Sequence, residues 1–154
     1  MIETPQVTTV PATLTAVIRL HIPCEDCRKE FSPAVTEILA ELARQGIKPA
    51  GPLFDHHFSA PGTHFDFEIG FPTATPVQPA GRIIPSERPE LRAVRTVLHG
   101  DYELLPEAWP EFMKWIGSQG LQTTEDFWQI FATGPEASDN PEDWRTELVR
   151  PLTH

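Results

Sequence analysis

Apolar residues recur with helical spacing in two stretches of the chain, and the two stretches match each other. In each stretch the apolar positions follow i, i+3, i+4 and i+7, which is the spacing of one buried face on an amphipathic helix. The two sets are Val35, Ile38, Leu39 and Leu42, and Trp109, Phe112, Met113 and Ile116. The second set follows the first at a constant offset of 109 − 35 = 74 residues. The pattern therefore predicts two equivalent helices.

The self-similarity extends beyond the helices. Gln45-Gly46 matches Gln119-Gly120 at the same offset, 119 − 45 = 74. Farther along, the segment that begins at Glu68 matches the one that begins at Glu147, now at an offset of 147 − 68 = 79. The extra residues, 79 − 74 = 5, fit in the polar loop at 137–143. Repetition of this kind indicates a duplicated structural unit.

Each copy reads as strand, helix, strand, strand. Alternating apolar positions and turn signals predict the strands, and Ser32-Pro33 suits an N-cap followed by the first helical position. For the first copy the expected elements are a strand at 15–22, a helix from Ser32-Pro33 to Gly46, and strands at 53–59 and 63–71 around a turn at Ala60-Pro61-Gly62. For the second copy they are a strand at 91–99, a helix at 106–119, and strands at 127–132 and 144–149.

We expect a single α+β domain over residues 1–154. The first repeat covers 14–72, a proline-rich bridge covers 73–90 with Arg82-Ile83-Ile84 as a short edge, and the second repeat covers 91–152. Residues 1–13 are expected to form an extended arm. One copy alone cannot bury its sheet, so the strands are expected to form one curved, mainly antiparallel sheet with both helices on one face. The other face would hold a ligand groove.

The charge of the chain argues against nucleic acid as a partner. Twelve Lys and Arg residues against 22 Asp and Glu give a formal charge of −10, whereas phosphate backbones need a basic surface. An acidic surface suits cationic small molecules or a basic protein partner, although solubility alone explains it more simply. No apolar run is long enough to span a membrane and no export signal is present, so the expected location is cytoplasmic.

The two cysteines, Cys24 and Cys27, form a CxxC motif. A redox motif of the thioredoxin type requires its CxxC at a helix N-terminus that follows a strand. Glu25 and Asp26 between the thiols are expected to raise the thiol pKa, which argues against a reactive pair. A zinc site lacks the second pair of ligands. We therefore favour two reduced thiols in a connecting segment and expect no metal and no cofactor.

The second copy resembles the GyrI-like, AraC-type effector-binding domain. In the first copy, Asp66-Phe67-Glu68-Ile69-Gly70-Phe71-Pro72 is similar to the corresponding family segment. The matching motifs of the second copy are the run from Gly100-Asp101-Tyr102 to Trp109, then Trp115, Gln119-Gly120, Phe127-Trp128, Gly134-Pro135 and Trp144-Arg145-Thr146-Glu147-Leu148. The resemblance covers the chain from Thr15 to Leu152. It implies a duplicated fold with a ligand groove, found in multidrug-responsive regulators, in free-standing binding proteins and in small hydrolases of cyclopropanoid compounds.

The chain departs from that family pattern on the strand that begins at Phe127. The usual Trp-Glu-x-Tyr reads Trp128-Gln129-Ile130-Phe131 here. Gln129 forms hydrogen bonds but does not take a proton at neutral pH, and Phe131 offers only a ring face. General-base catalysis needs a group that titrates near the working pH. The usual hydrolase mechanism and the sensing of lipophilic cations are therefore both disfavoured.

The duplication suggests another polar pair. At the offset of 74 residues, Asp55 corresponds to Gln129 and His57 to Phe131. An acid beside a histidine is a pair that catalysis uses, and alternation along a strand keeps His56 off the face of Asp55. The alternative, which we favour, is that Asp55-His56-His57 lies solvated and idle at a hairpin end.

Other candidates were weighed in the same way. Tyr102 either closes one end of the groove or packs between a strand and a helix. Trp109 is more often a core residue than a ligand contact. Glu68 and its counterpart Glu147 face either the groove or, more commonly for glutamate, solvent.

The leading hypothesis is a free-standing protein that captures a hydrophobic or aromatic small molecule in the central groove. The ligand-binding candidates are Asp55, His57, Glu68, Tyr102, Trp109, Gln129 and Phe131. No catalytic residue is assigned, and the chain is expected not to be an enzyme. The rival is a hydrolase of small electrophilic, cyclopropanoid-type compounds that uses Asp55 and His57. A third alternative is an acidic inhibitor that binds a protein partner.

Overall fold

The computed structural model describes residues 2–59 and 62–153. Two compact units make up the chain, one of Pro11–Glu90 and one of Met1–Val10 with Leu91–His154. We call them the first-copy unit and the second-copy unit, because they hold the first and the second repeat. Both consist of antiparallel strands and one long helix, which confirms the expected α+β class.

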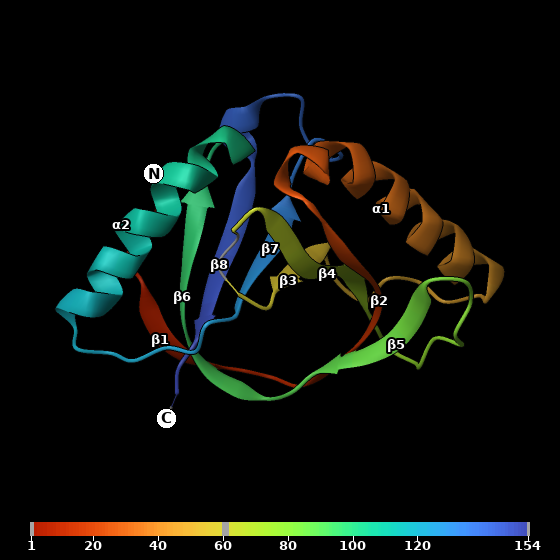
Figure 1. Cartoon of the computed structure of the whole chain (residues 1–154), viewed down its shortest axis with the longest axis horizontal. Helices are drawn as coiled ribbons and strands as arrows, with labels where there is room; N and C mark the ends of the chain where they lie inside the picture. The colour runs from red at the N-terminus through yellow and green to blue at the C-terminus, as the bar shows by residue number, and fades with distance from the viewer. Residues whose placement is uncertain (1, 60–61, 154) are drawn as a thin grey trace. The chain divides into compact units, whose positions relative to one another are not determined.

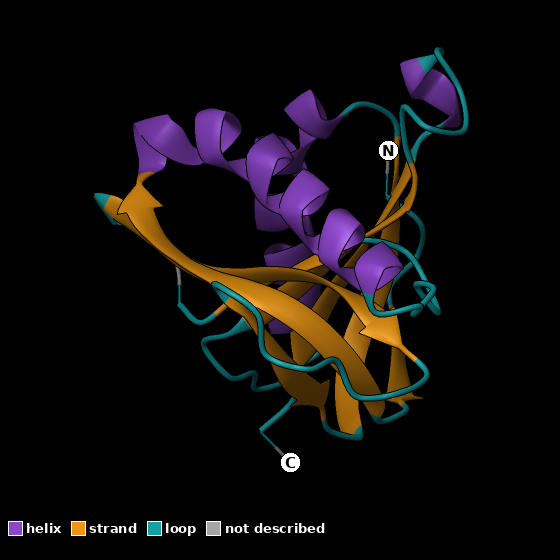
Figure 2. Cartoon of the chain, turned by 90° about the vertical axis from the view of Figure 1, so that its right-hand side faces the viewer, coloured by secondary structure: helices purple, strands orange, loops and turns teal. Residues whose placement is uncertain are grey.

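The first-copy unit has a four-stranded antiparallel sheet in the order β3-β4-β2-β5. Its helix α1 packs on one face of this sheet, and Figure 2 shows the helix lying across the strands. The elements are β2 (Thr13–Pro23), a short 3₁₀ turn η1 (Cys24–Asp26), α1 (Cys27–Arg44), β3 (Phe54–His57), β4 (His64–Thr73) and β5 (Ile83–Arg88).

The second-copy unit repeats this arrangement with the strand order β1-β6-β8-β7. Figure 1 shows α2 beside β6. The elements are β1 (Gln6–Val10), β6 (Leu91–His99), a 3₁₀ turn η2 (Tyr102–Leu104), α2 (Leu105–Ser118), β7 (Phe127–Thr133), a 3₁₀ turn η3 (Pro141–Asp143) and β8 (Arg145–Pro151).

The edge strands come from unexpected parts of the chain. β1, in the segment expected to be only an extended arm, pairs with β6 of the second copy. β5, in the proline-rich bridge, pairs with β2 of the first copy and contains Pro85. A proline is tolerated there because an edge strand has one side without ladder hydrogen bonds. The sheet of each repeat is therefore completed by a strand from outside that repeat.

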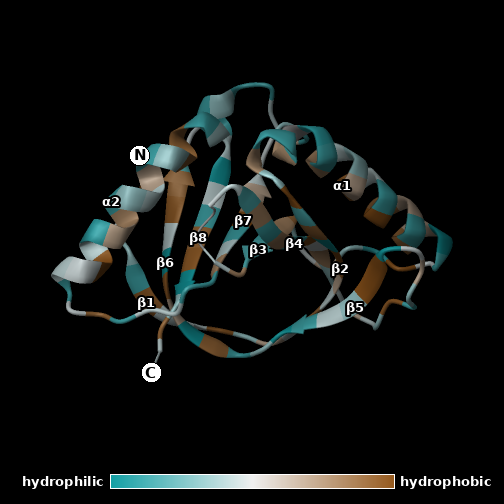
Figure 3. Ribbon diagram, in the orientation of Figure 1, coloured by the Kyte–Doolittle hydropathy of each residue, from teal (hydrophilic) through white to brown (hydrophobic). Residues whose placement is uncertain are grey.

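Both helices bury the stripes that their spacing predicts, with one exception. Ile38 and Leu42 are at most 1% exposed, and their equivalents Phe112 and Ile116 at most 2%. The prediction that Leu39 lies on the buried face is wrong, because Leu39 is 41% exposed. The third buried position in each stripe is an alanine, Ala34 in α1 and Ala108 in α2, again 108 − 34 = 74 residues apart. Figure 3 shows β6 as largely hydrophobic and both helices as mixed.

Helix α1 begins earlier than expected. The Ser32-Pro33 signal is wrong as a start, because α1 begins at Cys27 and carries Pro33 inside. Acidic residues of the preceding turn, among them Asp26, lie where the positive end of the helix dipole favours negative charge. The end was predicted well: Gly46 follows the helix with φ of +72°, and Gly120 follows α2 with φ of +68°.

Two further expectations concern turns and membranes. In the predicted turn Ala60-Pro61-Gly62, Ala60 and Pro61 lie outside the described residues. Within 2–59 and 62–153, no helix is both long enough and apolar enough to cross a bilayer.

Candidate functional site

Asp55 and His57 form a buried acid and histidine pair on β3. Their side chains are two residues apart on a strand, so they point to the same face. The imidazole Nε2 of His57 lies 3.5 Å from Oδ2 of Asp55. Asp55 is 4% exposed and His57 is 6% exposed. The expectation that these groups are solvated at a hairpin end is therefore wrong, because the fold buries both of them.

Phenylalanine rings surround the imidazole. His57 stacks on Phe67 of β4 with 4.8 Å between ring centroids and 10° between planes. Phe65 meets it edge-on at 5.5 Å. In this apolar setting, water competes little for the contact between Nε2 of His57 and the carboxylate of Asp55. The carboxylate can therefore orient the imidazole for accepting a proton.

The pair lies on the helix-covered face of its sheet. Asp55 pairs across the ladder with Ile69 and His57 with Phe67, and both partners belong to the core cluster that α1 covers. Asp55 also interacts with Cys27, the first residue of α1. We expected these residues on the face away from the helices, so their placement differs from that expectation.

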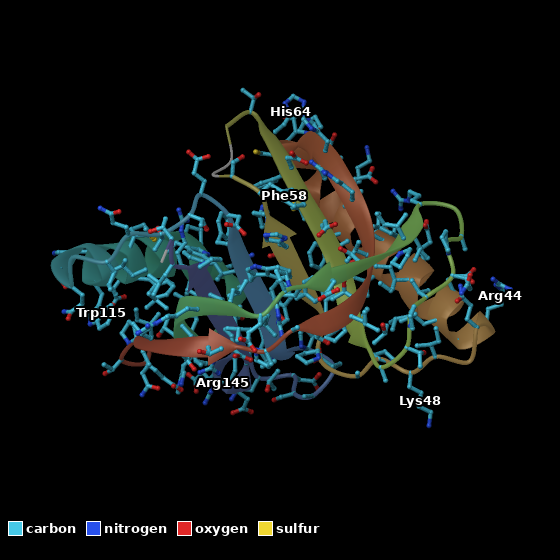
Figure 4. All side chains as sticks on the ribbon, turned by 90° about the horizontal axis from the view of Figure 1, so that it is seen from below. Arg44, Lys48, Phe58, His64, Trp115 and Arg145 are labelled. Atoms are coloured by element: carbon cyan, nitrogen blue, oxygen red, sulfur yellow. The ribbon has the colours of Figure 1, made fainter. Side chains whose placement is uncertain are left out.

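Glu68 lies on the opposite face of the same sheet. Its carboxylate is 3.7 Å from Nδ1 of His56, and both side chains are only 13–14% exposed. Arg19, its cross-strand neighbour, forms an ion pair with Asp66 at 3.1 Å and covers the ring of Phe58 at 4.4 Å. Figure 4 labels Phe58 near His64, toward the same end of this unit. Glu68 therefore does not share a site with Asp55.

Glu147, the counterpart of Glu68, behaves in the same way. It pairs with Arg95 through an ion pair across β6 and β8. Its neighbour Leu148 belongs to the core that α2 covers, so strand alternation sends Glu147 to the other face. Both glutamates are paired on the helix-free faces of their sheets.

Gln129 is held by Trp109 in the second-copy unit. The indole Nε1 donates a hydrogen bond to Oε1 of Gln129 at 2.8 Å. Gln129 is 9% exposed and pairs with Leu148 on the face that α2 covers. Trp109 is thus more than a core residue, because it joins α2 to the polar group of β7.

Aromatic rings flank Gln129 along β7. Trp109 lies 4.7 Å from Phe127, with 58° between the ring planes. Tyr102 meets Phe131 edge-on at 5.4 Å and lies 5.0 Å from Trp144. The register of β7 shifts between Ile130 and Thr133, an interval that contains Phe131. A bulge of this kind changes the direction in which nearby side chains point. Four of the predicted site residues therefore form two contacts along β7, Trp109 with Gln129 and Tyr102 with Phe131.

Four residues near Tyr102 were not among the predicted site residues, namely Asp101, Gly134, Glu136 and Trp144. Burial raises the pKa of the Tyr102 phenol, and the carboxylates of Glu136 and Asp101 raise it further. Gly134 lies so close that an added Cβ would be 2.4 Å from the Tyr102 hydroxyl. The ring of Trp144 lies 5.0 Å from that of Tyr102, with 33° between the ring planes. Asp101, Gly134 and Trp144 lie in motifs of the resemblance, whereas Glu136 carried no sequence signal.

The cysteines occupy a turn and a helix start. Neither is in a disulfide, and both are partly buried. Burial raises the pKa of the Cys27 thiol, followed by the effects of Asp55 and Cys24. Glu25 and Asp26, the expected causes, are not among the groups responsible. Within the described part of the chain, no cluster of three or more His, Cys, Asp or Glu residues is arranged to hold a metal.

Comparison with protein families gives one match. The sequence model of the GyrI-like small molecule binding domain matches residues 3–153. Among proteins with curated descriptions, none matches the sequence.

Four solved structures illustrate the similarity of the fold. The C-terminal domain of EcmrR superposes with a TM-score of 0.85 at 19% identity, covering 97% of this chain and 96% of that one. EcmrR in its complex with DNA superposes with a TM-score of 0.84 at 18% identity. That match covers 97% of this chain and only 57% of the EcmrR chain. SAV2435 bound to tetraphenylphosphonium superposes with a TM-score of 0.66 at 9% identity, covering 98% of this chain and 94% of that one. A hydrolase encoded by lin2189 from Listeria innocua superposes with a TM-score of 0.67 at 14% identity, covering 97% of this chain and 91% of that one.

Proposed function

Because the chain belongs to the GyrI-like small molecule binding domain family, we propose that it captures a hydrophobic or aromatic small molecule. The proposed binding groups are Tyr102, Trp109, Gln129 and Phe131 in the second-copy unit. Tetraphenylphosphonium bound to SAV2435 is a precedent for ligands rich in aromatic rings.

The observation that carries the proposal is the hydrogen bond from Trp109 to Gln129 among aromatic rings. Ligand sites combine apolar and aromatic linings with a few fixed polar groups that set orientation. Here the indole holds Oε1 of the amide, so the NH₂ group is oriented as well. A ligand that places a hydrogen-bond acceptor at this amide and stacks on the rings would be recognised.

The amide also determines which ligand charge is preferred. A glutamine carries no charge, so it does not offset the desolvation of a cation in the way that a carboxylate does. The net charge of −10 attracts cations at long range, but salt screens that field beyond about 8 Å. We therefore propose a neutral ligand with an acceptor group.

The test compares two probes of similar ring content. Calorimetry with triphenylphosphine oxide, which is neutral and has an acceptor oxygen, should show tighter binding than calorimetry with tetraphenylphosphonium. Gln129→Ala should remove the preference for the oxide. Tighter binding of the phosphonium by about tenfold, or 1.4 kcal/mol, would overturn the neutral-ligand proposal. If neither probe, nor any member of a wider aromatic panel, raises the melting temperature, the binding proposal itself fails.

A hydrolase is the second candidate, because of the buried pair of Asp55 and His57. A histidine held 3.5 Å from a carboxylate can activate water as a general base, a contribution of about 10²–10⁴ in rate. The similar fold of a hydrolase from Listeria innocua supports a test with small electrophilic substrates such as strained rings and aryl esters.

The two histidines of β3 provide a matched pair of variants. His57→Gln should abolish turnover, whereas His56→Gln, on the opposite face of the sheet, should leave it unchanged. Asp55→Asn should lower turnover as His57→Gln does. An absence of turnover over the whole substrate panel, or equal activity in His57→Gln and His56→Gln, would eliminate the hydrolase.

A further inference from the structure

The CxxC motif lies where a thiol–disulfide motif belongs. β2 ends at Pro23, the turn η1 begins at Cys24, and α1 begins at Cys27. The backbone N–H of Cys27 donates to the carbonyl of Cys24, which closes a helical turn between them. In helical geometry, residues three apart have Cα atoms about 5 Å from each other. Disulfides need about 4.4–6.8 Å between Cα atoms.

The two thiols differ in their surroundings. Cys24 lies at the outer side, where its Sγ contacts the carbonyl of Gly62 at 3.5 Å and its backbone N–H donates to Thr63. That contact is at the beginning of β4, beside the exposed His64 that Figure 4 labels. Cys27 instead packs against the core of the first-copy unit. One thiol is therefore suited to meet a small molecule and the other to act on its neighbour.

A buried carboxylate accompanies the inner thiol. Asp55 is 4% exposed, and its charge raises the pKa of the Cys27 thiol. A thiol with a raised pKa reacts slowly unless a nearby base removes its proton. Asp55 pairs across the ladder with Ile69, which belongs to the core cluster that Cys27 packs against. Its carboxylate is therefore a group of the right kind, on the same face of the sheet, to accept that proton.

We propose that Cys24 and Cys27 form a reversible intrachain disulfide by exchange with a small-molecule disulfide, and that Asp55 accepts the proton of Cys27 during the exchange. The thiolate of Cys24 attacks one sulfur of the small disulfide, forming a mixed disulfide and expelling one small thiolate, which takes a proton from water. Cys27 then loses its proton to Asp55, and its thiolate attacks the sulfur of Cys24. The bond from Cys24 to the small thiol breaks, and that second thiolate also takes a proton. Two protein thiols are oxidised, and one disulfide is reduced to two thiols.

Intact-mass analysis with oxidised glutathione as the probe tests each step. The full chain is incubated in glutathione buffers of graded ratio, quenched by alkylation and weighed. Wild type should lose both alkylatable thiols and gain no glutathione. Cys27→Ser should stop with one glutathione on Cys24, and Cys24→Ser should react more slowly and form no intrachain bond. Retention of both thiols by wild type at every ratio, or stable glutathione adducts on both cysteines, would overturn the disulfide.

Kinetics of the second step test the part played by Asp55. Asp55→Asn should leave the first step unchanged and slow release of the second glutathione by about a hundredfold, the lower end of the contribution of a positioned base. Asp55→Glu should recover part of the rate. Circular dichroism establishes that each variant is folded. A second step as fast in Asp55→Asn as in wild type removes Asp55 from the proposal, while the cysteine variants still decide the disulfide.

Discussion

The indole of Trp109 donates a hydrogen bond to the side-chain carbonyl of Gln129, joining α2 to β7 at 2.8 Å. The bond fixes which end of the amide is the acceptor. It also makes position 129 replaceable by glutamate without loss of this contact, because a carboxylate accepts the same hydrogen bond.

We expect Gln129→Glu to convert the protein into a binder of lipophilic cations. A carboxylate that is 9% exposed pairs strongly with a cation, so affinity for tetraphenylphosphonium should rise by about tenfold or more, a change of about 1.4 kcal/mol. Affinity for triphenylphosphine oxide should fall. Calorimetry of both probes measures the effect.

The control is Gln122→Glu, which adds the same charge at an exposed position. If both variants raise the cation affinity equally, the gain comes from net charge and Gln129 is not at the binding site.

Removing the indole N–H should destabilise the second-copy unit. Trp109→Phe keeps an aromatic ring and removes the indole donor to Oε1 of Gln129. Loss of a partner for a buried polar group costs about 1–3 kcal/mol, so the midpoint of urea unfolding should fall. Trp115→Phe, on the same helix, provides the comparison for loss of an indole alone. A free energy of unfolding that changes no more for Trp109→Phe than for Trp115→Phe would contradict the role of this bond.

Much of the fold was predictable because each of the two copies predicts the same order of strands and helix. Asp55 pairs with Ile69 and Gln129 with Leu148, so the structure reproduces both sequence offsets, 129 − 55 = 74 and 148 − 69 = 79. The face of the site was not predictable. A period of two shows which residues share a face, but not which face a helix covers.

The electrostatic interaction between Cys27 and Asp55 was also hidden from the sequence. These residues belong to elements far apart in the chain, and their interaction depends on where α1 begins. The Ser32-Pro33 signal placed that start too late, which left both cysteines outside the helix. Local helix signals compete with one another, and tertiary packing decides among them.

The titration of Tyr102 can be measured directly, because it is the only tyrosine of the chain. Its phenol should ionise above its usual pKa of about 10, since burial and the carboxylates of Glu136 and Asp101 disfavour the charged form. The ultraviolet absorbance of the phenolate follows this titration without interference from another tyrosine. Glu136→Gln should lower the midpoint, whereas the exposed Glu142→Gln should not.

The raised pKa of Tyr102 makes the free energy of unfolding fall at alkaline pH. The folded pKa is raised, so the stabilising contribution is fully present below the unfolded pKa of about 10 and is lost as the pH rises through the folded pKa. Urea unfolding across that range should show a fall in stability that is smaller in Tyr102→Phe. An equal fall in Tyr102→Phe would assign the pH dependence to other groups.

The contact between Gly134 and Tyr102 predicts a rescue. In Gly134→Ala the new Cβ would approach the Tyr102 hydroxyl to 2.4 Å, so the ring must shift away from Phe131 and Trp144. We expect a loss of about 1–3 kcal/mol, as for other overpacked sites. Tyr102→Phe removes the nearer of two clashing oxygens, the other being Oε2 of Glu136 at 2.9 Å. The double variant should therefore be more stable than the sum of the single effects, by about 0.5–3 kcal/mol in a double-mutant cycle. Thermal and urea unfolding of the four proteins measure that coupling, and strictly additive effects would mean that Gly134 is needed for a reason other than the space occupied by Tyr102.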